Sequence, residues 1–124
     1  MIQLDFGDHR PLYEQIRDKV KELIISGVLS ENEHIPSVRE LAASLAINPN
    51  TIQKAYKELE SEGYIYSLQS KGSFVAPRGK VTDNPKSEEL LNTLDGIVNE
   101  LCFLGTPKEK LEEIINKIYK EEAR

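Results

Sequence analysis

Two short amphipathic patterns, separated by residues 46–48, constrain the fold of this chain more than any other feature. The first begins at residues 37–40 (SVRE), a capping box in which the serine hydroxyl accepts a backbone hydrogen bond and the glutamate reaches back. The second begins at Asn48-Pro49, where asparagine is a favourable N-cap and proline suits the first helical position. This spacing predicts two helices joined by a tight turn, the helix-turn-helix arrangement.

The flanking segments complete one small domain, residues 1–76. Apolar residues at helical spacing predict a first helix over residues 11–26. After Gly63 the periodicity changes, and β-rich runs at 64–67 and 73–75 predict a short hairpin, the wing of a winged helix-turn-helix. We expect residues 2–6 to add an edge strand. The predicted fold class is therefore mainly α with a small β wing.

A polar stretch without periodicity, residues 77–85, is expected to link this domain to a C-terminal helical hairpin, residues 86–124. Two amphipathic patterns meet there at Gly105. Such a small pair of helices cannot bury its apolar faces alone, so we expect a second subunit to cover them. Cys102 is expected to be a small buried side chain within this pair. The residues expected at the dimer interface are Leu90, Leu94, Ile97, Leu101, Leu104, Leu111, Ile114, Ile115 and Ile118.

The charge of the chain is unevenly distributed. The formal net charge is −5, yet residues 36–80 carry six basic and four acidic side chains, whereas residues 81–124 carry six and ten. A basic middle permits a nucleic-acid face. No apolar run approaches the roughly 18 residues of a membrane span, no secretory signal is recognisable, and a single cysteine suits a reducing compartment. We expect a cytoplasmic protein without membrane association.

The sequence carries no recognisable catalytic or metal-binding pattern. His9, His34 and Cys102 share no metal-ligand spacing. No phosphate-binding glycine loop and no nucleophile–base pair is visible. We therefore expect no metal, no cofactor, no catalytic residues and no enzymatic activity.

The helix that begins at Pro49 has one apolar and one polar face. The apolar face is Ile52, Ala55, Tyr56 and Leu59, with Tyr56 expected in the core. Outward asparagine and glutamine side chains can pair with adenine in a DNA major groove, and lysines can contact phosphates or guanine. Arg39, in the first turn of the preceding helix, can contact the backbone or reach into the groove. The outward residues expected to contact DNA are Asn50, Thr51, Gln53, Lys54 and Lys57.

The run IPSVRELAASLAINPNTIQKAYKELESEGYI, followed by KGSFV, resembles the DNA-binding domain of the GntR family of bacterial transcription regulators, as does the opening PLYEQI. The short chain, the two-helix tail in place of a large ligand-binding domain, and the NPNT turn resemble its YtrA subfamily. The motif resemblance covers residues 9–76. It implies a homodimer on an inverted-repeat operator, usually a repressor and often near transporter operons. The DNA contacts it implies are Arg39, Asn48, Asn50, Thr51, Gln53 and Lys54.

The sequence departs from the family pattern at two places. Many relatives have a glycine- and arginine-rich wing tip, whereas this chain reads QSKG at residues 69–72, which leaves Lys71 as the only charged candidate for a DNA contact. Ala46 stands where a glycine is usual before the turn.

Two other functions stay open at this point. The chain is also compatible with a sensor in which a small-molecule effector, bound near the helical hairpin, shifts the dimer and releases DNA. Alternatively, the winged helix binds a protein partner. Salt-insensitive partner binding without DNA affinity would distinguish that function from DNA recognition.

Overall fold

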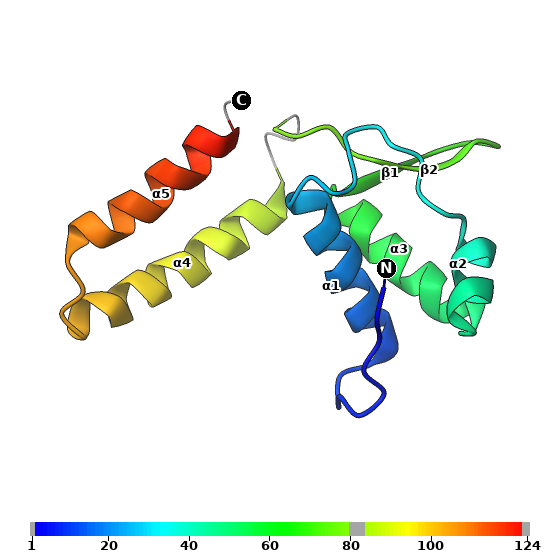
Figure 1. Cartoon of the computed structure of the whole chain (residues 1–124), viewed down its shortest axis with the longest axis horizontal. Helices are drawn as coiled ribbons and strands as arrows, with labels where there is room; N and C mark the ends of the chain where they lie inside the picture. The colour runs from blue at the N-terminus through cyan, green and yellow to red at the C-terminus, as the bar shows by residue number, and fades with distance from the viewer. Residues whose placement is uncertain (1, 80–83, 123–124) are drawn as a thin grey trace. The chain divides into compact units, whose positions relative to one another are not determined.

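The computed structural model describes residues 2–79 and 84–122. It divides into two compact units, Met1–Asn84 and Pro85–Arg124. The first holds α1 (Leu12–Ile25), α2 (Val38–Leu45), α3 (Pro49–Ser61) and a hairpin of β1 (Ile65–Leu68) and β2 (Gly72–Val75) (Figure 1). The second holds α4 (Pro85–Phe103) and α5 (Lys108–Glu122). The mainly helical fold with a small sheet is the predicted class.

Local hydrogen bonds fix the ends of α2 and α3, as predicted. At α2 the Ser37 hydroxyl accepts from the Glu40 N–H at 3.1 Å, and Glu40 Oε1 accepts from the Ser37 N–H at 3.1 Å. At α3 the Asn48 side chain accepts from the Asn50 N–H at 2.9 Å. Between the helices, Ala46 adopts the left-handed conformation (φ 56°), which strains a residue with a Cβ atom. The turn therefore forms without the usual glycine.

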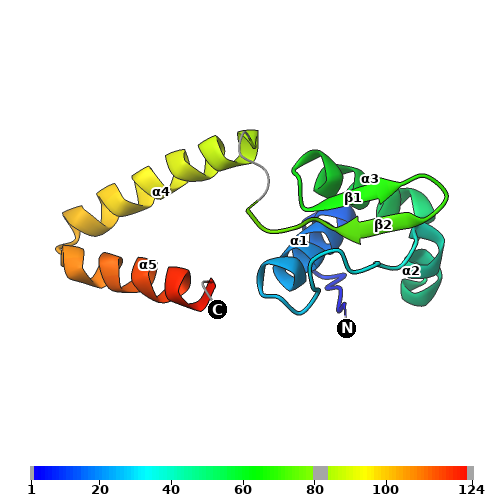
Figure 2. The ribbon, with the colours of Figure 1, turned by 90° about the horizontal axis from the view of Figure 1, so that it is seen from above.

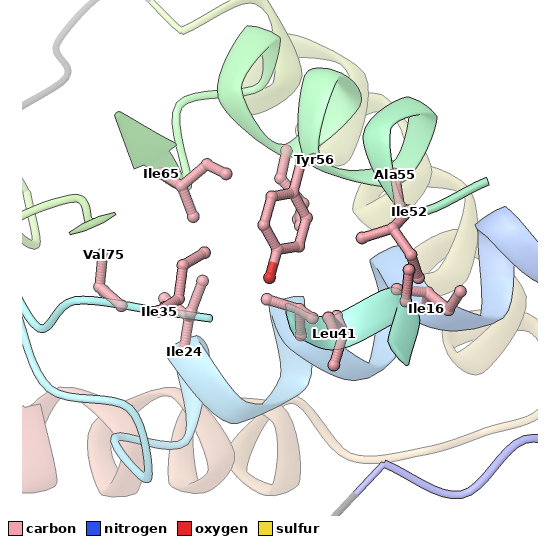
Figure 3. Close-up of a cluster of buried hydrophobic side chains, with 12 residues drawn as sticks. Ile16, Ile24, Ile35, Leu41, Ile52, Ala55, Tyr56, Ile65 and Val75 are labelled. Carbon is pink, nitrogen blue, oxygen red and sulfur yellow. The ribbon is translucent and has the colours of Figure 1, made fainter. Parts of the chain in front are cut away.

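The first unit is built on one apolar core (Figure 3). The predicted inward face of α3 is buried, and its members pack with residues from α1, α2, the segment before α2, and both strands. Tyr56 is 6% exposed, and its hydroxyl donates to the Pro36 carbonyl at 2.7 Å. Tyr56 therefore ties α3 to the chain that leads into α2. The buried apolar residues are Ile16, Val20, Ile24, Ile35, Leu41, Ala42, Ile52, Ala55, Tyr56, Leu59, Ile65 and Val75.

Helices α1 and α3 run side by side in the same direction (Figures 1 and 2). Two ion pairs join them at the same sequence offset of 41 residues. Arg17 Nη1 lies 2.7 Å from Glu58 Oε1, and Lys21 Nζ lies 3.1 Å from Glu62 Oε1. The constant offset means that each turn of α1 faces one turn of α3.

The wing forms as predicted, but its neighbour is not the expected segment. The strands pair antiparallel, with Ile65 opposite Val75 and Leu68 opposite Gly72. Residues 32–35 run along the free edge of β2, where the Ile35 N–H donates to the Ser73 carbonyl at 3.0 Å and the Val75 N–H to the Glu33 carbonyl at 2.9 Å. A segment that is distant from residues 2–6 thus occupies that edge.

Residues 2–6 form no strand, so that prediction was wrong. The side chain of Gln15, a buried residue of α1, hydrogen-bonds the backbone of this segment instead. Its Oε1 accepts from the Asp5 N–H at 3.0 Å, and its Nε2 donates to the Asp5 carbonyl at 3.1 Å. Ile2 and Leu4 pack against the core at the same time. A side chain has taken the place of a neighbouring strand as hydrogen-bond partner.

The second unit is a hairpin of two amphipathic helices that diverge from the turn at Gly105 (Figure 2). Its first helix begins at Pro85, within the stretch predicted to be linker. None of residues 85–121 is buried. Cys102 is exposed in the single chain, contrary to expectation. Of the predicted interface residues, Leu101 and Leu111 are half-buried and the others, Leu90, Leu94, Ile97, Leu104, Ile114, Ile115 and Ile118, are exposed.

Over residues 2–79 and 84–122, no helix combines the length and apolar character needed to cross a membrane. Nor do three His, Cys, Asp or Glu side chains gather there in a way that would hold a metal ion.

Candidate nucleic-acid interface

The outward face of α3 presents a row of polar side chains above a fully buried apolar face. Asn50, Gln53, Lys54 and Lys57 are exposed, and Thr51 is half-buried at the first turn. The structure thus brings the predicted outward residues together on one helix. Amide, hydroxyl and ammonium groups at this spacing offer both donors and acceptors to base edges, and donors to phosphates.

At the start of α3, the side chain of the N-cap residue Asn48 already takes part in a hydrogen bond within the protein. Because Asn48 Oδ1 accepts from the Asn50 N–H, that oxygen serves the helix cap. The Asn48 side chain remains exposed, as does that of Asn50. Pro49 removes one backbone donor from this end, so the side chains carry much of its hydrogen-bonding capacity.

Arg39 is exposed in the first turn of α2. Glu40 and Glu58 could in principle form a salt bridge with Arg39, but both carboxylates have other partners. Glu40 accepts from Ser37, whose backbone N–H lowers the pKa of that carboxyl, and Glu58 accepts from Arg17. Within the described ranges, Arg39 has no salt-bridge partner, so its guanidinium is available to an external anion.

Lys54 lies beside an aromatic ring of α1. Its Nζ is 4.0 Å from the centroid of the Tyr13 ring, a cation–π contact. The two side chains border an open hollow of about 400 Å³ between the first turns of α1 and α3; its lining residues are Pro11, Leu12, Tyr13, Asn50, Thr51 and Lys54. Sequence reasoning missed Tyr13, because only the packing of the two helices brings it to Lys54.

The wing carries Lys71 at its exposed tip. Ser70 and Gly72 have positive φ angles of 66° and 102°. The positive φ of Gly72 favours glycine, and a Cβ atom there would lie 2.7 Å from His34 Nε2, so the His34 ring would have to shift. The Phe74 ring packs between the rings of His34 and Tyr66, with centroid distances of 5.1 and 5.6 Å. These aromatic contacts therefore stabilise the part of the hairpin that carries the tip.

The wing tip, α2 and the start of α3 lie toward the same end of the first unit in both views (Figures 1 and 2). Arg39, in the first turn of α2, and Lys71, at the wing tip, therefore belong to elements that lie at the same end as the start of α3. A polar helix face with cations on neighbouring elements has the composition of a surface that reads bases with one helix and contacts the phosphate backbone with others.

Comparison with known proteins agrees with this geometry. Residues 12–75 match the family model described as bacterial regulatory proteins, gntR family. The chain is 40% identical, over 95% of its length and 92% of the other protein, to the HTH-type transcriptional repressor YtrA of Bacillus subtilis (strain 168).

Two solved structures share the fold. A transcriptional antiterminator from Listeria monocytogenes EGD-e matches with a TM-score of 0.71 and 36% identity, over 94% of this chain and 88% of that one. The DNA-binding domain of AraR in complex with operator ORR3 matches with a TM-score of 0.51 and 33% identity, over 60% of this chain and 92% of that one. The chain therefore belongs to the gntR family of bacterial regulatory proteins, in which it is a DNA-binding transcriptional regulator that resembles the YtrA subfamily.

Proposed function

We propose that this chain is a repressor that binds an inverted-repeat operator as a homodimer. The observation that carries the proposal is the outward face of α3, where Asn50, Gln53 and Lys57 are exposed above a fully buried apolar face. The similarity to the repressor YtrA and to an AraR domain bound to its operator supports the same function.

The side chains divide into two roles by their chemistry. Asn50 and Gln53 have the amide geometry that pairs with adenine N6 and N7, so they read bases. Lys57 and Lys71 carry compact charges suited to phosphates, and Arg39 anchors the backbone or enters the groove. Asn48 and Thr51 lie at the helix start, where they contact the adjacent phosphate or sugar.

This division is tested by two single substitutions. Gln53→Ala is expected to cost roughly 1–3 kcal/mol of binding free energy on the operator. It should relax the preference for a particular base at one operator position only. Lys57→Ala is expected to weaken binding evenly across sequences. It should also reduce by about 1 the salt slope, which is the steepness with which the logarithm of the binding constant falls with the logarithm of the salt concentration. Equal losses for both variants on operator and random DNA would contradict the division of roles.

Dimerisation through α4 and α5 follows from their uncovered apolar faces. Ile97 is 52% and Ile118 57% exposed in the single chain, and residues 85–121 contain no buried side chain. A unit without a core does not hold its structure in water, so a second copy supplies the missing contacts. Two-fold symmetry then presents two α3 helices to successive major grooves about 34 Å apart.

Selection from a randomised duplex pool at moderate salt tests the operator. Enrichment of an inverted repeat, with half-site centres about 10 bp or a multiple of that apart, is expected. Failure to enrich any sequence with folded dimeric protein would contradict the proposal. Because one matched structure is a transcriptional antiterminator, RNA of the selected sequence is the control, and it is expected to bind no better than random RNA.

Sedimentation equilibrium tests the dimer. The chain is expected at twice its 14.1 kDa mass, and Ile97→Glu is expected to give monomer because a charge then replaces an apolar contact. Asn92→Glu, at another exposed position of α4, is the matched control and should leave the dimer intact. Loss of the dimer in both variants, or in neither, would contradict the assigned interface.

The cellular location and the target genes that we propose are based on membership of the family. A bacterial regulator acts on chromosomal DNA, so we place the protein in the cytoplasm. The resemblance to the YtrA subfamily points to genes of a transporter operon, which the positions of the selected sites in the genome will test.

A further inference from the structure

The contacts between α1 and α3 form a regular ladder. Tyr13 meets Lys54, Arg17 meets Glu58, and Lys21 meets Glu62, all at the offset of 41 residues. The ladder runs from the starts of both helices, at the hollow described above, toward their ends.

The first rung differs from the other two in charge. Arg17 faces Glu58 of α3 and Lys21 faces Glu62, the residue that follows α3, whereas the ammonium of Lys54 faces a neutral ring. In residues 2–79 and 84–122, no carboxylate lies within salt-bridge distance of Lys54. The ring attracts the ammonium through its quadrupole but does not neutralise its charge. The charge of the ammonium therefore remains available to an external anion.

The direction of the Lys54 side chain limits which part of DNA it meets. Its ammonium lies over Tyr13, on the flank of α3 that faces α1. When a helix lies in the major groove, its flanks face the phosphate backbones that form the groove walls. An ammonium has three donors, so it can bind a phosphate oxygen while it stays over the ring.

We propose that Tyr13 is a positioning residue, which holds Lys54 ready for a backbone phosphate and makes Lys54 a sequence-independent anchor. The inference rests on the proposed DNA-binding function. A lysine side chain loses much rotational freedom when it binds, and a contact that already restricts it in the free protein lowers that entropic penalty. Tyr13 thus contributes to DNA affinity through Lys54.

A double-mutant cycle on the full chain tests this inference. The probe is a random-sequence duplex of about 30 bp, roughly three helical turns, titrated over a series of salt concentrations. Lys54→Ala is expected to reduce the salt slope by about 1. Tyr13→Leu is expected to weaken binding roughly two- to five-fold, the fold-change that corresponds to an exposed cation–π contact. In the Lys54→Ala background, Tyr13→Leu is expected to have no further effect.

Two further variants separate positioning from a structural role. Tyr13→Phe keeps the ring and should retain wild-type affinity. Tyr64→Leu removes the matched contact at the other end of the helix pair, where Lys21 Nζ lies 5.0 Å from the Tyr64 ring, and should leave the affinity and the salt slope unchanged. Thermal melting of each variant verifies that the fold is retained.

Three results would overturn the inference: an equal loss from Tyr13→Leu with and without Lys54, an unchanged salt slope in Lys54→Ala, or a Tyr13→Phe variant as weak as Tyr13→Leu. Failure of the wild-type protein to bind either the random duplex or a selected one would instead overturn the proposed function, and this inference with it.

Discussion

Tyr56→Phe is the most informative single change in the DNA-binding unit, because one hydroxyl connects α3 to the chain leading into α2. The Tyr56 hydroxyl donates to the Pro36 carbonyl at 2.7 Å, while its ring packs in the core (Figure 3). Burial, together with the negative charge of Glu40, raises the pKa of Tyr56 to about 12. The substitution removes the hydrogen bond and the ionisable group but retains the ring.

The expected effect has two parts. At neutral pH the loss of the hydrogen bond lowers the free energy of unfolding by about 1 kcal/mol. For a domain of this size, this corresponds to a melting temperature that is lower by roughly 4–8 °C. Above pH 10 the unfolded tyrosine ionises while the folded one keeps its proton. Stability that is fully present below about pH 10 is therefore lost as the pH rises toward 12, by about 1.4 kcal/mol per pH unit. Tyr56→Phe lacks this loss, so the two stability curves should cross near pH 11, by the same linkage.

Urea unfolding followed by circular dichroism, at one protein concentration and from pH 7 to 11.5, measures both parts. Tyr66→Phe is the control: its hydroxyl contacts the Asn32 side chain at 2.9 Å on the surface, so its curve should stay parallel to that of the wild type. Parallel curves for Tyr56→Phe, or a stability equal to wild type at pH 7, would refute the assigned role of the hydroxyl.

Three further substitutions test the turn, the wing and the N-terminal segment. Ala46→Gly should stabilise the protein by about 0.5–1 kcal/mol, because glycine adopts the left-handed conformation without strain; a lower melting temperature would contradict this. Gly72→Ala should destabilise the wing by about 1–3 kcal/mol, since the new methyl group meets His34 at a positive φ; faster amide exchange in β1 and β2 would reveal it, and unchanged exchange would refute it. Gln15→Ala removes both hydrogen bonds to Asp5 and should cost about 1–2 kcal/mol; limited proteolysis should then cut residues 2–10 faster, and an unchanged cleavage rate would count against the anchoring role.

Short-range features of the sequence determined the helix-turn-helix. The capping box at residues 37–40 and the cap at Asn48-Pro49 close hydrogen bonds over two or three residues, so they form wherever the chain allows a helix to begin. The alternation of apolar and polar positions likewise separated the buried face of α3 from the exposed one. Each predicted DNA-contact residue within α3 is at least partly exposed for this reason.

Contacts between distant segments were decided only by the tertiary structure. Residues 2–6 have an extended, apolar character that fits an edge strand, but Gln15 binds their backbone and residues 32–35 occupy the free edge of β2. Local sequence patterns do not show which of two segments pairs with the free edge of a sheet, because that pairing depends on how the whole domain packs.

The same limit applies to the candidate interface. Lys54 was identifiable as an outward lysine from helical periodicity alone, whereas its contact with Tyr13 depends on the offset at which α1 and α3 pack. Sequence by itself determined where α2 and α3 begin and which face of α3 is buried, because these follow from hydrogen bonds and periodicity within a few residues. The tertiary structure decided which side chains meet across helices, because that depends on how the buried faces fit together.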